Sequence, residues 1–140
     1  ERIHQDEMVL IAPVTGHPDI MAVADIKKFP MVSREKGSGS RDACERALLE
    51  RGVSVADLPV ALACTTSEGV REAVAAGLGV GFISRLAVPA AMLSDKLKIV
   101  AIKGFTIRRD FFLAYQNGRT LSRPAALLAD ELRKISRKRD

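Results

Sequence analysis

Residues 34–52 read REKGSGSRDACERALLERG, with two glycines, two serines and an arginine directly ahead of a run that has helical character. The apolar run FPMV at 29–32 predicts a strand before this stretch. Apolar residues then recur on one face at helical spacing: Ala43, Cys44, Ala47 and Leu48. The stretch therefore predicts a strand, a small polar loop and a helix. Such a junction exposes backbone N–H groups at the positive end of a helix dipole, which favours the binding of an anion.

The same alternation continues along the chain and indicates the fold class. PVALAC at 59–64 predicts a second strand, TTSEGVREAVAAG at 65–77 an amphipathic helix, and LGVGFIS at 78–84 a third strand. Strand and helix that alternate through short links are typical of an α/β fold, with a mainly parallel sheet and flanking helices. Two more strands are expected at KLKIVAI, residues 96–102, and at DFFLAY, residues 110–115.

Helix-end signals place the boundaries of these helices. Thr65, followed three residues later by Glu68, fits a capping box at the start of the second helix, with Ser67 as a rival N-cap. Gly77 is expected to end that helix in the left-handed conformation. The last helix is expected to open at Ser122, with a proline in its first turn.

The topology predicts where a ligand would bind. In an open α/β sheet, ligands bind outside the carboxyl ends of the strands. Two strand-to-helix junctions are expected there, from Glu35 to Arg41 and from Cys64 to Glu68, and both are rich in serine, threonine and glycine. These residue types are also ordinary helix caps. Two such junctions on one edge nevertheless favour an anion site.

The sequence does not match the motifs of common enzymes. GLGVG at 77–81 follows a helix and enters a strand, which is the reverse of the order in a dinucleotide-binding fingerprint. GSGSR at 37–41 has no GK[ST] to make it a P-loop. No nucleophile elbow with histidine and aspartate partners is present. The sequence therefore predicts a protein that is not an enzyme.

Composition bounds the remaining function classes. The chain has 140 residues, 47% hydrophobic and 28% charged, which suits one globular domain. Five of the 22 basic residues lie in the last eight positions, so most of the net charge of +5 belongs to a basic tail. That tail suits either nucleic-acid contact or a solvated helix end. With 4% aromatic residues and no tryptophan, a base-stacking surface is not expected.

Metal, cofactor and membrane signals are weak throughout. Cys44 and Cys64 belong to no CxxC pair and are expected to be buried thiols. His4 and His17 have no ligand-type partners at metal spacing, so neither a metal site nor a cofactor is expected. No apolar run approaches the ~18 residues of a membrane span. Because the chain opens without methionine, we expect it to be part of a longer protein.

Four segments, in this order, carry a family resemblance: VLIAPVTGHP, DIKKFPMVSREKGSGSR, TTSEGVREAVAAGLGVGFIS and RTLSRPAALLADEL. From about Glu7 to Leu132 the chain resembles the effector-binding domain of LysR-type transcriptional regulators. The most specific parts are the RE-x-GSGSR loop and the helix-strand unit that ends in AGLGVGFIS. Among subgroups, the loop is most similar to that of regulators of sulfur, nitrogen and carbon-fixation genes.

The resemblance implies a periplasmic-binding-protein type II-like fold, with two α/β lobes joined by crossing strands near Val9–Pro13 and Phe111–Tyr115. Residues of about 14–110 would form the second lobe, and 1–13 with 111–140 the crossing strand and the return to the first lobe. A small, usually anionic effector would bind between the lobes. The resemblance further implies a cytoplasmic homodimer or tetramer that binds DNA through a separate N-terminal helix-turn-helix domain, which this chain lacks.

The resemblance also assigns ligand-binding residues to the two junctions. They are Gly37, Ser38, Gly39, Ser40 and Arg41 in the first junction, and Thr66 and Ser67 in the second. Ser40 stands where relatives often have threonine, which keeps the hydroxyl group. Two other functions remain open: a periplasmic solute-binding protein of a transporter, which would use the same fold and anion site, and an enzyme acting on a phosphorylated substrate.

Overall fold

The computed structural model describes residues 1–93, 95–116, 118 and 120–137. The chain divides into two compact units. The larger unit comprises residues 7–108, and the smaller comprises residues 1–6 and 109–140.

A mainly parallel sheet forms the centre of the larger unit. Its strands have the order β2-β6-β1-β5-β3-β4, and β7 pairs with β1 outside this path. β1 is antiparallel to both of its neighbours β5 and β6, while the other five strands of the path share one direction. The bounds are β1 Arg2–Pro13, β2 Ile20–Met21, β3 Met31–Arg34, β4 Val60–Cys64, β5 Val80–Ser84, β6 Leu97–Ile102 and β7 Ile107–Phe112. The predicted α/β class with a mainly parallel sheet is confirmed.

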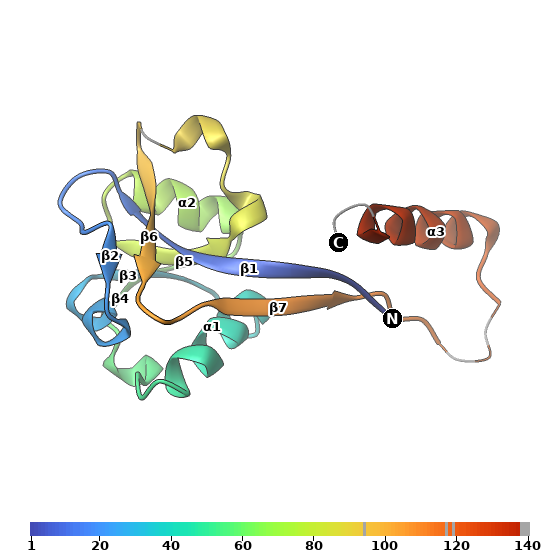
Figure 1. Ribbon diagram of the computed structural model, residues 1–140, viewed down its shortest axis with the longest axis horizontal. Coiled ribbons are helices and arrows are strands. Elements are labelled where there is room, and N and C mark those ends of the chain that lie inside the picture. The colour runs from blue at the N-terminus through green and yellow to red at the C-terminus, as the bar shows by residue number, and fades with distance from the viewer. Residues whose placement is uncertain (94, 117, 119, 138–140) are drawn as a thin grey trace. The chain divides into compact units, whose positions relative to one another are not determined.

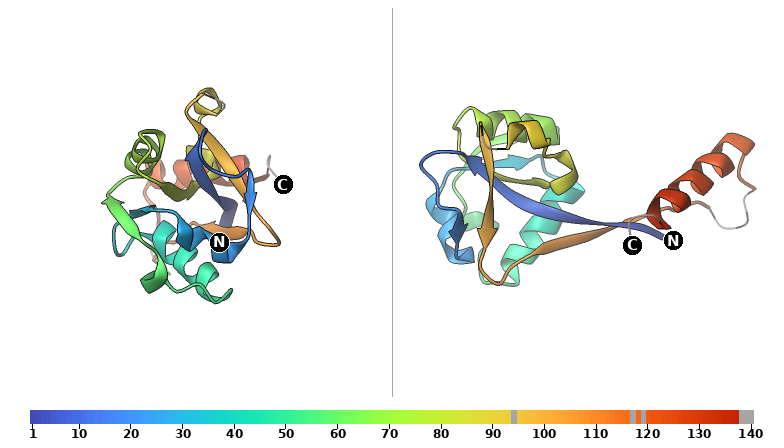
Figure 2. Two further views of the ribbon diagram at one scale, coloured as in Figure 1. Left: turned by 90° about the vertical axis from the view of Figure 1, so that its left-hand side faces the viewer. Right: turned by 45° about the horizontal axis from the view of Figure 1, so that its top comes forward.

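Two helices cover opposite faces of this sheet, α1 Gly39–Leu49 and α2 Ser67–Ala75 (Figure 1 and Figure 2). α1 buries Cys44 and Leu48 in a cluster with Met31, whereas α2 buries Val70 in a cluster with Val32. Met31 and Val32 are adjacent on β3 and point to opposite faces, as a strand requires. The described residues of this unit also form the 3₁₀ helices η1 Val23–Lys28, η2 Val55–Asp57, η3 Arg85–Ala87 and η4 Ala90–Met92.

The glycines after α2 have the structural roles that their positions suggested. Gly77 has φ +86° and, as the C′ residue, ends α2, while the Leu78 N–H donates to the Ala73 carbonyl at 3.1 Å. Gly79 has φ +145°, and a Cβ placed there would lie 2.1 Å from the carbonyl oxygen of Pro30. Helix capping and close packing therefore explain these glycines, and no dinucleotide is needed to explain them.

The N-cap of α2 differs from the prediction. Thr66 caps this helix, because its hydroxyl accepts a hydrogen bond from the Gly69 N–H at 2.9 Å. The predicted caps Thr65 and Ser67 were therefore one position off on either side. At the last helix, α3 Arg123–Arg137, the expectation is confirmed: the Ser122 carbonyl accepts from the Ala126 N–H at 2.9 Å.

The smaller unit contains the first residues of β1, the last residues of β7, and α3. Strand β7 begins at Ile107, inside the larger unit, whereas the predicted strand began at Asp110 and ran to Tyr115, beyond the last strand residue Phe112. The charged run Arg108–Asp110 concealed the start of the strand from the sequence pattern. Arg109 nevertheless fits the strand, because it pairs with the buried carboxylate of Asp6 at 2.8 Å.

The larger unit begins at Glu7, and Met8 to Pro13 of β1 pair with β5 and β6 inside its sheet. The expected second lobe of about 14–110 and the return segments 1–13 and 111–140 stay predictions. The segment Val9–Pro13 is thus part of this sheet, and its role as a crossing strand between two lobes also stays a prediction. That the two units are parts of two lobes stays a prediction. Lys138, Arg139 and Asp140 of the predicted basic tail lie outside the described residues.

Candidate functional site

The two strand-to-helix junctions lie side by side at one edge of the sheet. β3 and β4 are parallel neighbours, and Arg34 at the end of β3 stands opposite Cys64 at the end of β4. The Glu35 N–H donates to the Cys64 carbonyl at 3.0 Å and forms the last link between the two strands. The loops that follow, 35–38 and 65–66, therefore start from the same edge, as the topology predicted. This strand-end edge is the candidate site.

At the first junction, a tight turn leads into α1. The Ser38 N–H donates to the Glu35 carbonyl at 3.2 Å, and Gly37 between them has φ +86°, in the left-handed region that favours glycine. Ser38 is the N-cap and is buried, yet in the described part of the chain its hydroxyl accepts no capping hydrogen bond. The Ser38 hydroxyl thus does not act as the side-chain acceptor that an N-cap serine usually supplies.

At the second junction, both predicted hydroxyl groups already have partners. Thr66 caps α2, and the Ser67 hydroxyl accepts a hydrogen bond from Nη1 of Arg34 at 3.3 Å. Because α1 and α2 cover opposite faces of the sheet, their N-termini approach the strand-end edge from opposite sides. Arg34 lies at the end of β3, between the two helices, and its side chain contacts Ser67 of α2.

Arg34 is the residue of this edge that the sequence analysis missed. Its guanidinium forms a two-pronged contact with the Glu35 carboxylate, Nε to Oε2 at 2.8 Å and Nη2 to Oε1 at 3.0 Å. These hydrogen bonds raise the pKa of Arg34 and lower the pKa of Glu35. The side chain of Arg34 is 18% exposed and that of Glu35 is 39% exposed. The signal was present in the sequence, since both residues belong to the RE-x-GSGSR loop.

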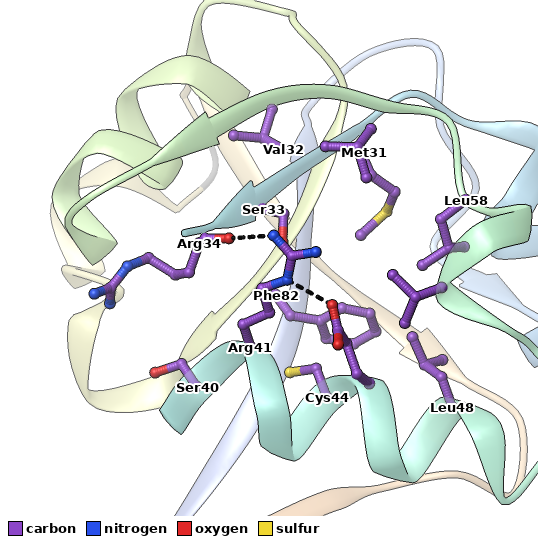
Figure 3. A pocket seen from close by; sticks show the side chains of 13 residues that line it. Met31, Val32, Ser33, Arg34, Ser40, Arg41, Cys44, Leu48, Leu58 and Phe82 are labelled. Atoms are coloured by element: carbon purple, nitrogen blue, oxygen red, sulfur yellow. Dashed lines mark hydrogen bonds and ion pairs between the residues drawn. The ribbon is translucent and has the colours of Figure 1, made fainter. Parts of the chain in front are cut away.

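Arg41, which was expected to contact the ligand, has protein partners of its own. Its Nε donates to Oε1 of Glu45 at 2.5 Å, and its Nη1 donates to the carbonyl oxygen of Arg34 at 3.1 Å. Its side chain is 14% exposed. Figure 3 shows the Arg41 guanidinium lying between α1 and β3, while the side chain of Arg34 points away from this space. Arg41 therefore ties α1 to the end of β3.

A small cavity lies beneath Arg41, between α1 and the sheet (Figure 3). It encloses about 30 Å³, and its wall is mostly apolar: Met31, Cys44, Leu48, Val55, Leu58, Val60 and Phe82. A volume of this size holds about one or two water molecules, which is too little for a metabolite. The cavity does not replace the strand-end edge as the candidate site.

Other reactive groups are few in the part of the chain that the structure describes. Cys44 is a buried cysteine, as expected, whereas Cys64 at the end of β4 is only partly buried, contrary to the expectation. Among the described residues, histidine, cysteine, aspartate and glutamate form no cluster of three or more that could hold a metal ion. None of the described helices has the length and apolar character to cross a bilayer.

Comparison with known proteins identifies the family. The family model described as the LysR substrate binding domain matches residues 1–136. The chain belongs to this family. The predicted resemblance is confirmed, and with it the classification among the effector-binding domains of a regulator family that is not enzymatic.

Relatives of this LysR substrate-binding domain include two RuBisCO operon transcriptional regulators. The RuBisCO operon transcriptional regulator of Allochromatium vinosum is 33% identical over 130 residues, which cover 90% of this chain and 41% of the relative. That of Acidithiobacillus ferrooxidans is 30% identical over 126 residues, covering 87% of this chain and 40% of the relative. The domain thus spans about two fifths of the length of these relatives.

Solved structures share the fold of this LysR domain. The regulatory domain of Synechocystis PCC6803 CcmR in complex with 2-PG has a TM-score of 0.83 and 24% identity, covering 97% of this chain and 65% of that one. The effector-binding domain of QuiR in complex with shikimate has a TM-score of 0.80 and 13% identity, with coverage of 98% and 64%. A putative phosphate transporter substrate-binding protein from Clostridium perfringens, with bound phosphate, has a TM-score of 0.73 and 20% identity, with coverage of 93% and 63%. The predicted periplasmic-binding-protein type II-like fold is therefore confirmed.

Proposed function

We propose that this LysR domain senses a small anionic metabolite at the strand-end edge and thereby controls a transcription regulator. The observation that carries the proposal is the pairing of Arg34 with Cys64, which brings two helix N-termini to one edge. Three proteins of similar fold were solved with 2-PG, shikimate and phosphate. Shikimate and phosphate are both anions at neutral pH, which agrees with this ligand class.

The proposed ligand contacts follow from the two junctions. Gly37, Ser38, Gly39 and Ser40 would supply N–H and hydroxyl donors at the start of α1, and Thr66 and Ser67 would supply those at the start of α2. Arg41 would contribute its backbone N–H, since its guanidinium is held by Glu45. The N-cap Ser38 supports this assignment, because an anion would supply the acceptor that its hydroxyl does not.

The expected affinity is modest. A helix N-terminus stabilises a negative charge by about 0.3–1 kcal/mol when exposed, and a charge-assisted hydrogen bond contributes about 1.5–3 kcal/mol. The loss of translational and rotational freedom offsets much of this gain. We therefore expect dissociation constants roughly between micromolar and millimolar.

Thermal unfolding tests the ligand class. Inorganic phosphate, 2-PG and shikimate should each be titrated into the chain, with a neutral sugar as the control ligand. We expect the anions to raise the Tm, and Ser38→Ala to reduce that rise. Ser54→Ala is the matched control, because Ser54 caps η2, ahead of β4 rather than at its carboxyl end, and should leave the rise unchanged. Stabilisation by the sugar and by none of the anions would contradict the proposal.

The function of the whole protein is a further part of the proposal. We propose a cytoplasmic homodimer or tetramer that binds DNA through an N-terminal helix-turn-helix domain. The relatives' description as transcriptional regulators supports this assignment over a transporter receptor. The coding sequence upstream of Glu1 decides between the two: a basic winged helix-turn-helix supports the regulator, and a cleavable signal peptide supports the transporter protein.

A further inference from the structure

The Arg34–Glu35 pair has the geometry of a bound anion. A guanidinium that donates from Nε and Nη2 to both oxygens of one carboxylate makes the contact that arginine makes with carboxylate or phosphate ligands. Here the carboxylate belongs to the next residue of the chain. Glu35 therefore occupies the donors of Arg34 that an anionic ligand at the strand-end edge would use.

The side chains of Arg34 and Glu35 differ in how strongly their surroundings hold them in place. Arg34 is the last residue of β3, which pairs with β4, its side chain is only 18% exposed, and Nη1 also donates to Ser67 on α2. The backbone of Glu35 is fixed by hydrogen bonds to Cys64 and Ser38, but its side chain is 39% exposed. The carboxylate can turn into water by side-chain rotation alone, while the guanidinium stays in place.

We propose that Glu35 is an internal competitor of the effector, which the anionic group of the effector displaces from Arg34. The inference rests on the proposed function and adds Arg34 to its binding residues. To displace Glu35, a ligand must make more hydrogen bonds at this edge than the Glu35 carboxylate makes with Arg34. A phosphate group has this capacity, because two of its oxygens can take the fork of Arg34 while a third accepts from N–H groups at the start of α1 or α2. Glu35 thus favours phosphorylated metabolites over simple monocarboxylates.

The second arginine–glutamate pair at the same strand end provides a matched control. Arg41 and Glu45 form a similar ion pair on the opposite face of β3, where Arg41 is 14% exposed and Glu45 is 32% exposed. Neither charged group of this pair competes for the donors of Arg34. Removal of the Glu45 charge should therefore not affect a ligand that binds Arg34.

Titration calorimetry with inorganic phosphate tests the inference on wild type, Glu35→Gln, Glu45→Gln, Arg34→Gln and Arg34→Lys, each checked for its fold by circular dichroism. We expect Glu35→Gln to bind phosphate about five- to tenfold more tightly than wild type, because a neutral amide is a weaker partner for arginine than a carboxylate. Glu45→Gln should match wild type. Arg34→Lys should bind more weakly than wild type because it lacks the fork, and Arg34→Gln should not bind measurably.

The outcomes separate the inference from the proposed function. Equal phosphate affinity in wild type and Glu35→Gln overturns the inference and leaves the anion site intact. Weaker binding in Glu35→Gln also overturns it, since Glu35 would then position Arg34 for the ligand. Binding by neither wild type nor Glu35→Gln contradicts the proposed function and the inference together. Binding by Glu35→Gln alone supports both, with Glu35 as a strong competitor.

Discussion

Gly37 and Gly39 flank the N-cap serine of α1 under different backbone constraints. Gly37 has φ +86°, whereas Gly39 is the first residue of the helix and has no positive φ. At both positions an added Cβ would contact no described atom within 4 Å beyond the chain neighbours. Steric room is therefore equal at the two positions, and backbone conformation alone distinguishes them.

This contrast predicts unequal effects of alanine on stability. Gly37→Ala should lower the free energy of unfolding by about 1–2 kcal/mol, because an L-residue must adopt the left-handed conformation. Gly39→Ala should change it by less than about 0.5 kcal/mol. Urea unfolding of the two variants, followed by circular dichroism, measures the difference. Equal losses would show that the turn can rearrange around Gly37, contrary to this account.

Arg34 and Arg41 show why side-chain roles at the site were harder to predict than the loops. Both arginines lie in the RE-x-GSGSR motif, and of the two only Arg41 was among the predicted ligand-binding residues. The strand period sends Arg34 to the face of α2, and the helical period places Glu45 one turn after Arg41. The Arg41–Glu45 spacing is visible in the sequence. The hydrogen bond from Arg34 to Ser67 depends on the strand order, which the sequence does not state.

Among the elements, α2 shows how far local signals determine a helix. Its amphipathic stripe and its end at Gly77 are properties of neighbouring residues and were predicted. Its first residue was not, because Thr65, Thr66 and Ser67 are all competent caps. The pairing of β4 with β3 ends at Cys64, and this end of the strand determines which of the three residues is the N-cap. The early start of β7 has a similar cause, since Arg109 is tolerated there by its contact with Asp6.

The cap assignment predicts a difference between two adjacent threonines. Thr66→Ala should lower the free energy of unfolding by about 1 kcal/mol, because the Gly69 N–H loses its acceptor. Thr65→Ala should change it by less than about 0.5 kcal/mol, since Thr65 is exposed and lies outside the helix. Thermal and urea unfolding of both variants measures the difference. A larger loss in Thr65→Ala would restore the capping box that the sequence suggested.

For the molecule as a whole, two carboxylates couple stability to acid pH. The Arg34 guanidinium lowers the pKa of Glu35 from its ordinary value of 4.5, and the Lys28 ammonium lowers the pKa of Asp25 from 3.8. A carboxylate whose pKa is lower in the folded state binds fewer protons there than in the unfolded state. Its stabilising contribution is therefore complete above the ordinary pKa and is lost as the pH falls through the lowered value.

The Tm should accordingly fall as the pH is lowered from about 5 toward 3. The double variant Glu35→Gln/Asp25→Asn should show a shallower fall over the same range, because both groups no longer titrate. Calorimetric scans of wild type and the double variant at matched ionic strength measure the two slopes. Parallel slopes would mean that these two ion pairs persist equally in the unfolded chain.

The division into two units predicts that residues 7–108 fold without the remainder of the chain. Both clusters of buried apolar side chains draw their members from this range, from Met8 to Ile107 in one and from Val9 to Leu97 in the other. The strands of the path from β2 to β4 also lie in this range, except for the first residues of β1. A segment of ~100 residues with its own core is long enough for independent stability.

A chain limited to residues 7–108 should therefore unfold cooperatively, with a Tm within about 5 °C of that of the whole chain. Removal of β7 beyond Arg108 and of α3 takes away the Arg109–Asp6 and Arg133–Glu1 ion pairs, all of whose members belong to the smaller unit. Far-UV circular dichroism and amide dispersion in an NMR spectrum measure the outcome. A broad, non-cooperative transition would show instead that the larger unit requires the strand pairing that β1 and β7 supply beyond its own boundary.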